Sequence, residues 1–306
     1  MSEEKMVISV PGSSANLGPG FDSIGLAVNR YLTLTVTPAD EWYFSADSQE
    51  LKGVPSGKDN LIYEVCEHVA NDLNMELPAC HVEMASDIPL ARGLGSSAAA
   101  IVAGIELANQ LLHANLPSSE KARIASLWEG HPDNVSASVY GGLVIGTHTE
   151  ESTEVVPCPA PEVEMVLMVP SEELKTKKAR GVLPESLPYK DAIKGGSIGN
   201  VLVAAIFSGD WELAGKMMVR DLYHHPYRAE LVPGLEDVLA SIHEYDAYGA
   251  ALSGAGPTII CFTAPNKGEQ LKAKLKEAFP QFSHELVYPD REGIKVKSTV
   301  ATKLFQ

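Results

Sequence analysis

A glycine-rich turn followed directly by a long alanine-rich segment constrains this chain more than any other feature. The run Gly93-Leu-Gly-Ser-Ser-Ala-Ala99 comes after a predicted strand, and the residues beyond it predict a helix from about Ser96 to Leu112. Glycines let a backbone approach a ligand closely, and a helix N-terminus offers free N–H groups and the positive end of the dipole. The segment therefore suits a phosphate, although a tight turn with a serine cap would explain the same residues.

Two more loops of small residues raise the weight of the phosphate interpretation. One is Pro11-Gly-Ser-Ser-Ala-Asn-Leu-Gly-Pro-Gly-Phe-Asp22, and the other is Ser253-Gly-Ala-Gly-Pro257. The chain contains neither the P-loop pattern Gly-x-x-x-x-Gly-Lys-[Ser/Thr] nor the dinucleotide pattern Gly-x-Gly-x-x-Gly. A phosphate site here would thus be of another kind.

Strand and helix patterns occur in both halves of the chain without a strict βαβ repeat, which indicates an α+β fold. We expect strands at Met6–Val10, Tyr31–Thr37, Cys80–Ala85, Gly142–Gly146, Val163–Val169, Ala250–Leu252, Thr258–Thr263, Glu285–Tyr288 and Lys295–Ala301. We expect helices at Leu61–Leu73, Ser96–Leu112, Ser118–Glu129, Pro132–Tyr140, Tyr189–Phe207, Trp211–Met218, Pro233–Tyr245 and Lys267–Phe279. The polar, proline-rich stretch 148–162 predicts a linker and a boundary between domains at 1–155 and 156–306.

Charge and cysteine content exclude several classes of protein. The 306 residues carry a net charge of −16, which argues against binding to nucleic acid or to an anionic membrane surface. The acidity is concentrated in residues 1–155, whose 7 basic and 21 acidic residues give −14. The 4 cysteines form no Cys-x-x-Cys pair, so we expect free thiols and a cytoplasmic protein.

The three loops, in this order, resemble the three motifs of the GHMP small-molecule kinase superfamily. The middle motif extends to Pro89-Leu-Ala-Arg-Gly-Leu-Gly-Ser-Ser-Ala-Ala99, and the last is Leu252-Ser-Gly-Ala-Gly-Pro-Thr258. Within the superfamily, the first loop together with Glu129-Gly-His-Pro-Asp-Asn134 and Arg228-x-x-Leu-x-Pro-Gly234 resembles the homoserine kinases. The resemblance covers about residues 7–263.

This resemblance implies a two-domain GHMP kinase architecture, with an N-terminal ribosomal-protein-S5-domain-2-like domain and a C-terminal ferredoxin-like α/β sandwich domain. It implies ATP under the middle loop, with Mg²⁺ held by Ser97 and Glu129, since Mg²⁺ takes hard oxygen ligands. Asn60 matches an adenine-contacting asparagine, although it would equally cap the helix that follows. The implied ATP-binding residues are Asn60, Pro89, Leu90, Ala91, Arg92, Gly93, Leu94, Gly95, Ser96, Ser97, Ala98 and Ala99.

The resemblance also implies L-homoserine as the phosphate acceptor and a homodimer as the assembly. Asp22 would face the ammonium, and Arg180 and Arg228 the carboxylate, because guanidinium groups match carboxylates. The implied substrate-binding residues are Asn16, Asp22, Asn134, Arg180, Arg228 and Gly254, and the implied catalytic residues are Asn16, Asn134, Glu129 and Ser97. Since asparagine cannot accept a proton, we expect direct in-line transfer without a strong protein base.

The sequence leaves some alternatives open. Another alcohol, such as mevalonate or a sugar, would suit the same enzyme class, and a non-catalytic nucleotide sensor or a plain α+β binding domain would share the loops. We expect Arg92 to be solvated and His131 to lie in a structural turn. We expect the rings of the adjacent pair His224 and His225 to point apart, without binding metal.

Overall fold

Alternating apolar residues near the start of the chain form the centre of the larger of two sheets. The structure is a computed structural model that describes residues 5–298. In that part of the chain a seven-stranded sheet has the order β11-β1-β2-β4-β3, with β5 pairing with β2 and β6 pairing with β5. Its strands are β1 (Met6–Ala15), β2 (Ile24–Pro38), β3 (Tyr43–Ala46), β4 (Cys80–Ser86), β5 (Leu143–His148), β6 (Thr153–Cys158) and β11 (Lys295–Ser298).

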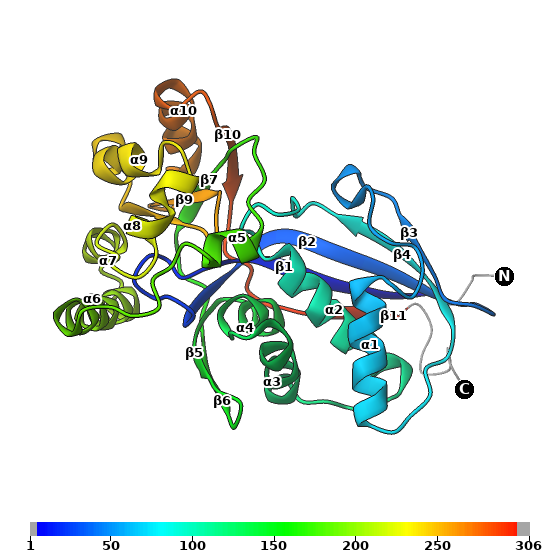
Figure 1. The fold of residues 1–306 in the computed structure, drawn as a ribbon. Coiled ribbons are helices and arrows are strands. Elements are labelled where there is room, and N and C mark those ends of the chain that lie inside the picture. The colour runs from blue at the N-terminus through cyan, green and yellow to red at the C-terminus, as the bar shows by residue number, and fades with distance from the viewer. Residues whose placement is uncertain (1–4, 299–306) are drawn as a thin grey trace.

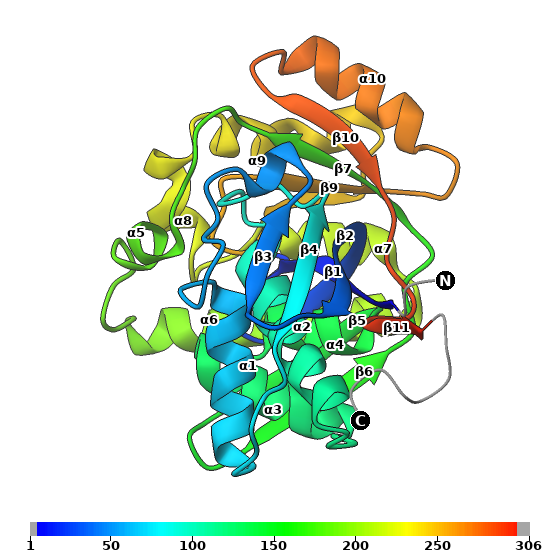
Figure 2. The ribbon, with the colours of Figure 1, turned by 90° about the vertical axis from the view of Figure 1, so that its right-hand side faces the viewer.

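Four helices pack against one face of this sheet (Figures 1 and 2). They are α1 (Leu61–Asp72), α2 (Ser96–Leu111), α3 (Ser118–Glu129) and α4 (Asp133–Tyr140). Ala- and Gly-rich α2 lies against both β1 and α1. Its Gly104 has no room for a side chain, since a Cβ there would lie 2.7 Å from the Ile62 carbonyl oxygen of α1. Gly104 thus lets α1 and α2 pack closely, and Gly95, whose Cβ would lie 2.4 Å from the Ser13 hydroxyl oxygen, lets the glycine loop lie against β1.

The second sheet is antiparallel, and three of its four strands are almost fully buried. Its order is β10-β7-β9-β8, formed by β7 (Glu164–Val169), β8 (Gly249–Leu252), β9 (Ile259–Thr263) and β10 (Ser283–Val287). Alternate residues of β7 enter two different apolar clusters, Met165 and Leu167 in one and Val166 and Met168 in the other. Burial on both faces explains why β7 and β9 are almost continuously apolar.

Helices lie on both faces of this sheet. Helices α6 (Tyr189–Ser208) and α7 (Trp211–Met218) share the first cluster with β7, while α9 (Leu235–Ser241) and α10 (Gly268–Ala278) share the second. Short elements complete the fold: α5 (Thr176–Arg180), α8 (His225–Arg228) and the 3₁₀ turns Gln49–Leu51, Ala229–Leu231 and Ile242–Tyr245. None of the helices in residues 5–298 combines the length and apolar character that crossing a membrane requires.

The predicted α+β class is confirmed, while two predicted loops are wrong. Strand β1 continues through Ala15, past a register shift between Pro11 and Gly12, where a loop was expected. The expected linker 148–162 contains β6, which forms a hairpin with β5. The polar residues of this stretch predicted a linker, but they belong to a strand with one exposed face, on which Glu154 and Val156 point to solvent.

The division into domains at 155 and 156 stays a prediction. That boundary falls inside β6, and β11, from the far end of the chain, pairs with β1 of the first sheet. The expected strand Lys295–Ala301 is present as far as Ser298, and its remainder lies outside the described residues.

Candidate active site

The three glycine loops singled out in the sequence meet at one place. The Ser13 N–H donates to the Leu94 carbonyl oxygen over 3.1 Å, and the Gly254 N–H donates to the Ala15 carbonyl oxygen over 3.0 Å. The Ser253 hydroxyl donates to the Gly93 carbonyl oxygen over 2.6 Å. Backbone and hydroxyl hydrogen bonds therefore tie all three loops together, although they are far apart in the sequence.

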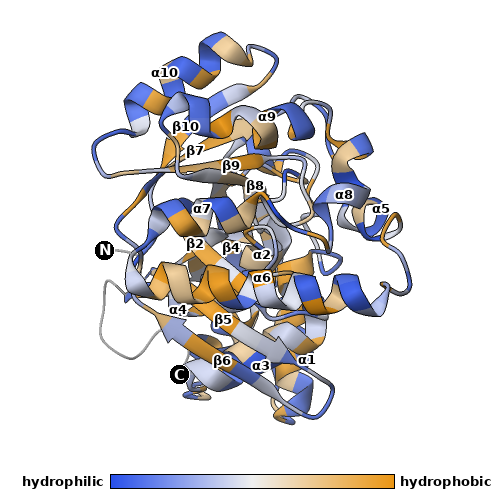
Figure 3. Cartoon of the chain, turned by 90° about the vertical axis from the view of Figure 1, so that its left-hand side faces the viewer, coloured by the Kyte–Doolittle hydropathy of each residue, from blue (hydrophilic) through white to orange (hydrophobic). Residues whose placement is uncertain are grey.

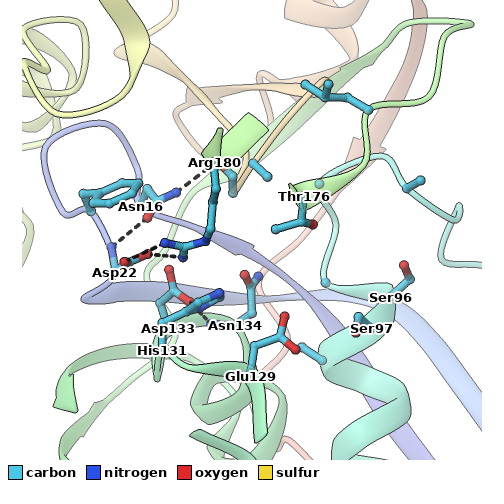
Figure 4. A pocket seen from close by; sticks show the side chains of 18 of the residues that line it. Asn16, Asp22, Ser96, Ser97, Glu129, His131, Asp133, Asn134, Thr176 and Arg180 are labelled. Atoms are coloured by element: carbon cyan, nitrogen blue, oxygen red, sulfur yellow. Dashed lines mark hydrogen bonds and ion pairs between the residues drawn. The ribbon is translucent and has the colours of Figure 1, made fainter. Parts of the chain in front are cut away.

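A cavity opens where the loops meet, and most of the predicted site residues line it (Figure 4). The predicted residues are Asn16, Asp22, Ala91, Gly93, Gly95, Ser96, Ser97, Ala98, Glu129, Asn134, Arg180, Arg228 and Gly254. Its other lining residues are Phe21, His131, Asp133, Leu174, Thr176 and Ala255. Acidic and basic side chains thus surround one cavity beside the start of α2.

The start of α2 has the geometry of an anion site. Gly95 precedes the helix with φ 69° and ψ 29°, in the left-handed region that favours glycine. The first backbone hydrogen bond of the helix runs from Ala99 N–H to the Gly95 carbonyl oxygen, so the N–H groups of Ser96, Ser97 and Ala98 point out of its end. These donors and the helix dipole favour an anion in the cavity.

An apolar cavity adjoins the first one, and both are lined by Ser96 and Ser97. Its apolar walls include Leu32, Leu51, Val54, Pro55, Met84 and Ile88, and two predicted ATP-site residues, Asn60 and Leu90, also line it. The buried Asn60 caps α1, accepting from the Ile62 N–H over 2.9 Å, and donates to the Pro55 carbonyl oxygen over 2.8 Å. The capping alternative for Asn60 is confirmed, and an adenine contact stays a prediction.

Four residues of the middle motif, Pro89, Arg92, Leu94 and Ala99, line neither cavity. The expectation that Arg92 is solvated is wrong. Its Nη2 donates to the Ser171 carbonyl oxygen over 2.7 Å, and its Nη1 lies 3.8 Å from Glu173, with the side chain only 15% exposed. The cause is tertiary: the segment before α5 folds over the glycine loop and covers this side chain.

Ser97 and Glu129 come together from two helices, one from the first turn of α2 and the other from the last residue of α3. Burial raises the pKa of the Glu129 carboxyl, while His131, Arg180 and a hydrogen bond from Ser97 oppose that rise. A hydroxyl and a carboxylate facing each other are hard oxygen donors of the kind that Mg²⁺ takes. The residues present therefore fit the predicted metal.

Asp22 and Arg180 form a two-pronged ion pair at the opposite side of the cavity. The Arg180 Nη2 and Nη1 donate to the two carboxylate oxygens over 2.6 and 3.1 Å. The guanidinium carbons of Arg180 and Arg228 lie 5.6 and 5.4 Å from the centre of the Phe21 ring. One anion and two cations thus gather around one aromatic ring, and burial together with the charge of Arg180 lowers the pKa of Arg228 to about 10.

The two asparagines hold the loops as well as lining the cavity. Asn16 has φ 72°, donates to the Gly254 carbonyl oxygen over 3.0 Å and accepts from the Asp22 N–H over 2.9 Å. The Asn134 amide nitrogen donates to the hydroxyl and carbonyl oxygens of Ser13 over 3.0 and 3.2 Å. Asn134 therefore keeps its side-chain oxygen for the cavity, whereas the amide of Asn16 mainly positions Asp22 and Gly254.

Sequence reasoning missed the acid–histidine pair in the cavity. His131 Nδ1 lies 2.7 Å from the Asp133 carboxylate, and the same oxygen accepts from the Asn134 N–H over 2.7 Å. Burial opposes the charged ring, but the hydrogen bond and the charge of Asp133 raise the pKa of His131. The His-x-Asp spacing at the start of α4 was the available signal.

The expected direction of the His224 and His225 rings is wrong as well, while the absence of a metal there stays a prediction. Their ring centres lie 4.5 Å apart instead of diverging. His224 precedes α8 with φ −139° and ψ −33°, outside the helical region, so the angle of about 100° between successive helical side chains does not apply.

Comparisons with known proteins agree with this geometry. Residues 60–142 match the GHMP kinases N terminal domain, and residues 202–281 match the GHMP kinases C terminal family. The chain is 60% identical to the homoserine kinase of Halalkalibacterium halodurans over 97% of this chain and 96% of that protein. It is 41% identical to the homoserine kinase of Staphylococcus haemolyticus over 95% of this chain and 97% of that one.

Solved structures of GHMP-type kinases have the same fold as this chain. The homoserine kinase of Cytophaga hutchinsonii superposes with a TM-score of 0.84 at 27% identity, covering 97% of this chain and 98% of that one. A mevalonate kinase shares the fold, with a TM-score of 0.69 at 18% identity over 94% of this chain and 99% of that one. With two GHMP kinase domains and relatives of this identity along nearly its whole length, the chain belongs to the homoserine kinase family.

Proposed function

We propose that this protein transfers the γ-phosphoryl group of ATP to the side-chain hydroxyl of L-homoserine, giving ADP and O-phospho-L-homoserine, a step toward threonine. The observation that best supports an amino acid as the substrate is the pairing of Asp22 with Arg180 beside Arg228. These charges lie in the same cavity as the start of α2. An amino acid offers an ammonium to the carboxylate and a carboxylate to the guanidinium groups. Neither mevalonate nor a sugar has an ammonium that could share the Asp22 carboxylate with Arg180.

The groups on the other side of the cavity suit ATP. The N–H groups at the start of α2 suit the phosphates, and the adjoining apolar cavity beside Asn60 suits the flat adenine ring. Ser97 and Glu129 would hold Mg²⁺, whose positive charge would offset the charge developing on the transferred group. Since residues 1–155 carry a net charge of −14, nucleotide affinity should depend strongly on Mg²⁺.

The proposed mechanism needs no strong protein base. The homoserine hydroxyl oxygen, oriented by the side-chain oxygen of Asn134 while Asn16 holds Asp22 and Gly254 around it, attacks the γ-phosphorus, the bond to the β-phosphate oxygen breaks, and the hydroxyl proton passes to phosphate or water. One carboxylate oxygen of Asp133 accepts from the Asn134 N–H and contacts His131, so this carboxylate helps to hold Asn134 in place. Positioning and electrostatics then supply most of the rate acceleration.

The test is ADP release with Mg·ATP and a panel of L-homoserine, mevalonate, L-serine and galactose. We expect turnover with L-homoserine to exceed that with the other three by orders of magnitude. Preferred turnover of mevalonate or galactose would replace the substrate assignment. A shift of the melting temperature by ATP without any ADP release would instead support a nucleotide sensor.

We also propose that the enzyme works as a cytoplasmic homodimer. Cys66, Cys80 and Cys261 are buried free thiols, which suits a reducing compartment. Helix α6, which lies toward the viewer in Figure 3, exposes the large side chains of Tyr189, Ile193 and Phe207, and a second copy would cover them. Light scattering of the purified protein should give twice the chain mass of 32.8 kDa, and a single chain mass would refute the dimer.

A further inference from the structure

Arg228 is held by three of its five N–H donors. Its Nε donates to the Ala179 carbonyl oxygen over 3.1 Å, and its Nη1 donates to the Gly254 carbonyl oxygen over 3.0 Å and to His224 Nδ1 over 3.1 Å. Within residues 5–298, no hydrogen bond from Nη2 to another protein group occurs. Because Arg228 lines the active-site cavity while only 1% exposed, its free N–H pair is the part that a ligand can reach.

The contacts of His224 define its protonation state. Its Nε2 lies 3.1 Å from the Gly18 carbonyl oxygen, which only accepts, and its Nδ1 faces a guanidinium, which only donates. The ring must therefore be neutral, with its hydrogen on Nε2. Complete burial, joined by the charges of His225 and Arg228, lowers the pKa of His224 well below its ordinary value, against the pull of Asp221 and in agreement with the neutral ring.

Asp221 fixes the backbone that carries this ring. One of its carboxylate oxygens accepts from the backbone N–H groups of His224 and His225 over 2.8 and 2.6 Å, and the other accepts from the backbone N–H of Tyr223 over 2.8 Å. In front, the Phe21 ring centre lies 5.4 Å from that of His224. The imidazole thus connects the first glycine loop, through Gly18, to the arginine in the cavity.

We propose that His224 is a positioning residue that aims the free Nη2 of Arg228 at the carboxylate of the amino-acid substrate. This inference rests on the proposed function, because it needs a substrate carboxylate in the cavity. Without the imidazole, one buried N–H of Arg228 would lack an acceptor and the Gly18 carbonyl oxygen would lack a donor. The guanidinium would then turn toward another acceptor, and its free N–H pair would leave the carboxylate.

The experiment compares two alcohols that differ only in the carboxylate, L-homoserine and 3-aminopropan-1-ol. In the His224→Leu variant, which is close in volume and has no hydrogen-bonding atom, the ratio of the two kcat/KM values should fall about 10- to 100-fold, the loss expected for one hydrogen bond to a charged group. The KM for ATP should stay unchanged. The His224→Gln variant should restore much of the ratio, since an amide supplies one donor and one acceptor.

A control variant should lower the stability of the fold without changing any residue of the cavity. Asp210 caps α7, accepting from the Leu213 N–H over 2.9 Å, so Asp210→Ala should lower the melting temperature and leave the ratio unchanged. Equal losses for both alcohols in His224→Leu, or a raised KM for ATP, would overturn the positioning role. If His224→Leu does not fold, His224→Asn, whose shorter side chain cannot reach both partners, should lower the same ratio. Wild-type failure to phosphorylate L-homoserine would overturn the proposed function itself, a separate outcome.

Discussion

Replacing Gly93 by alanine should damage the active site by a mechanism that the structure defines in detail. Gly93 has φ +73°, and a Cβ there would lie 2.3 Å from the Ser253 carbonyl oxygen and 2.7 Å from the Gly256 carbonyl oxygen. Both neighbours are backbone atoms of the third glycine loop, so neither can move as a side chain would. One methyl group therefore has to push two loops of the cavity apart.

The size of the effect follows from two contributions. Alanine in the left-handed region costs about 1–2 kcal/mol, and forcing an extra methyl group into a packed site costs about 1–3 kcal/mol more. Gly209 is a matched control, because it has φ +75° and a Cβ there would meet no atom within 4 Å. Gly209→Ala should therefore lose about 1–2 kcal/mol of unfolding free energy and Gly93→Ala about 2–5 kcal/mol.

The two variants should differ more in activity than in stability. A displacement of about 1 Å in a group that positions substrate can cost about 100-fold, so kcat/KM should fall by that order in Gly93→Ala and little in Gly209→Ala. Urea unfolding and ADP release with Mg·ATP and L-homoserine measure the two quantities. Similar kcat/KM values for the two variants would refute the argument that close contact between the loops positions the reacting groups.

Three other predictions follow from the cavity. Asp22→Asn should lower kcat/KM about 10- to 100-fold for L-homoserine but less for 4-hydroxybutyrate, which lacks the ammonium, and equal losses would contradict its role. Glu129→Gln should lower Mg²⁺-dependent kcat by about 100-fold or more with an unchanged circular dichroism spectrum, and an unchanged kcat would remove Glu129 from the metal site. Because the pKa of His131 is raised above 6.5, its pairing with Asp133 stabilises the fold fully below that pH and loses this effect as pH rises through the raised value. The difference in unfolding free energy between wild type and His131→Gln should therefore be larger at about pH 6 than at about pH 9, and an equal difference at both would exclude the linkage.

The local sequence pattern was sufficient to predict most helices and strands and the loops that surround the site. The helix after the glycine turn begins at Ser96 as predicted, because the turn, the start of the helix and its small residues lie within one short segment. Strand β6 was missed because its exposed face is polar, and its identity as a strand depends on pairing with β5. Burial of Arg92 was missed because the segment that covers it comes from a distant part of the chain.

The order of residues along the chain was enough to show which chemical groups the site contains: glycine loops, a helix start, hard oxygen donors and a set of opposite charges. Which of these groups meet became clear only from the packed fold. The ion pair of Asp22 with Arg180 joins residues 158 positions apart, and the contact of His224 with Gly18 joins residues 206 apart. Such contacts leave no periodic trace in the sequence, because they depend on how two sheets and their helices pack, and hydrogen bonding selects the partners only after packing has brought them within reach.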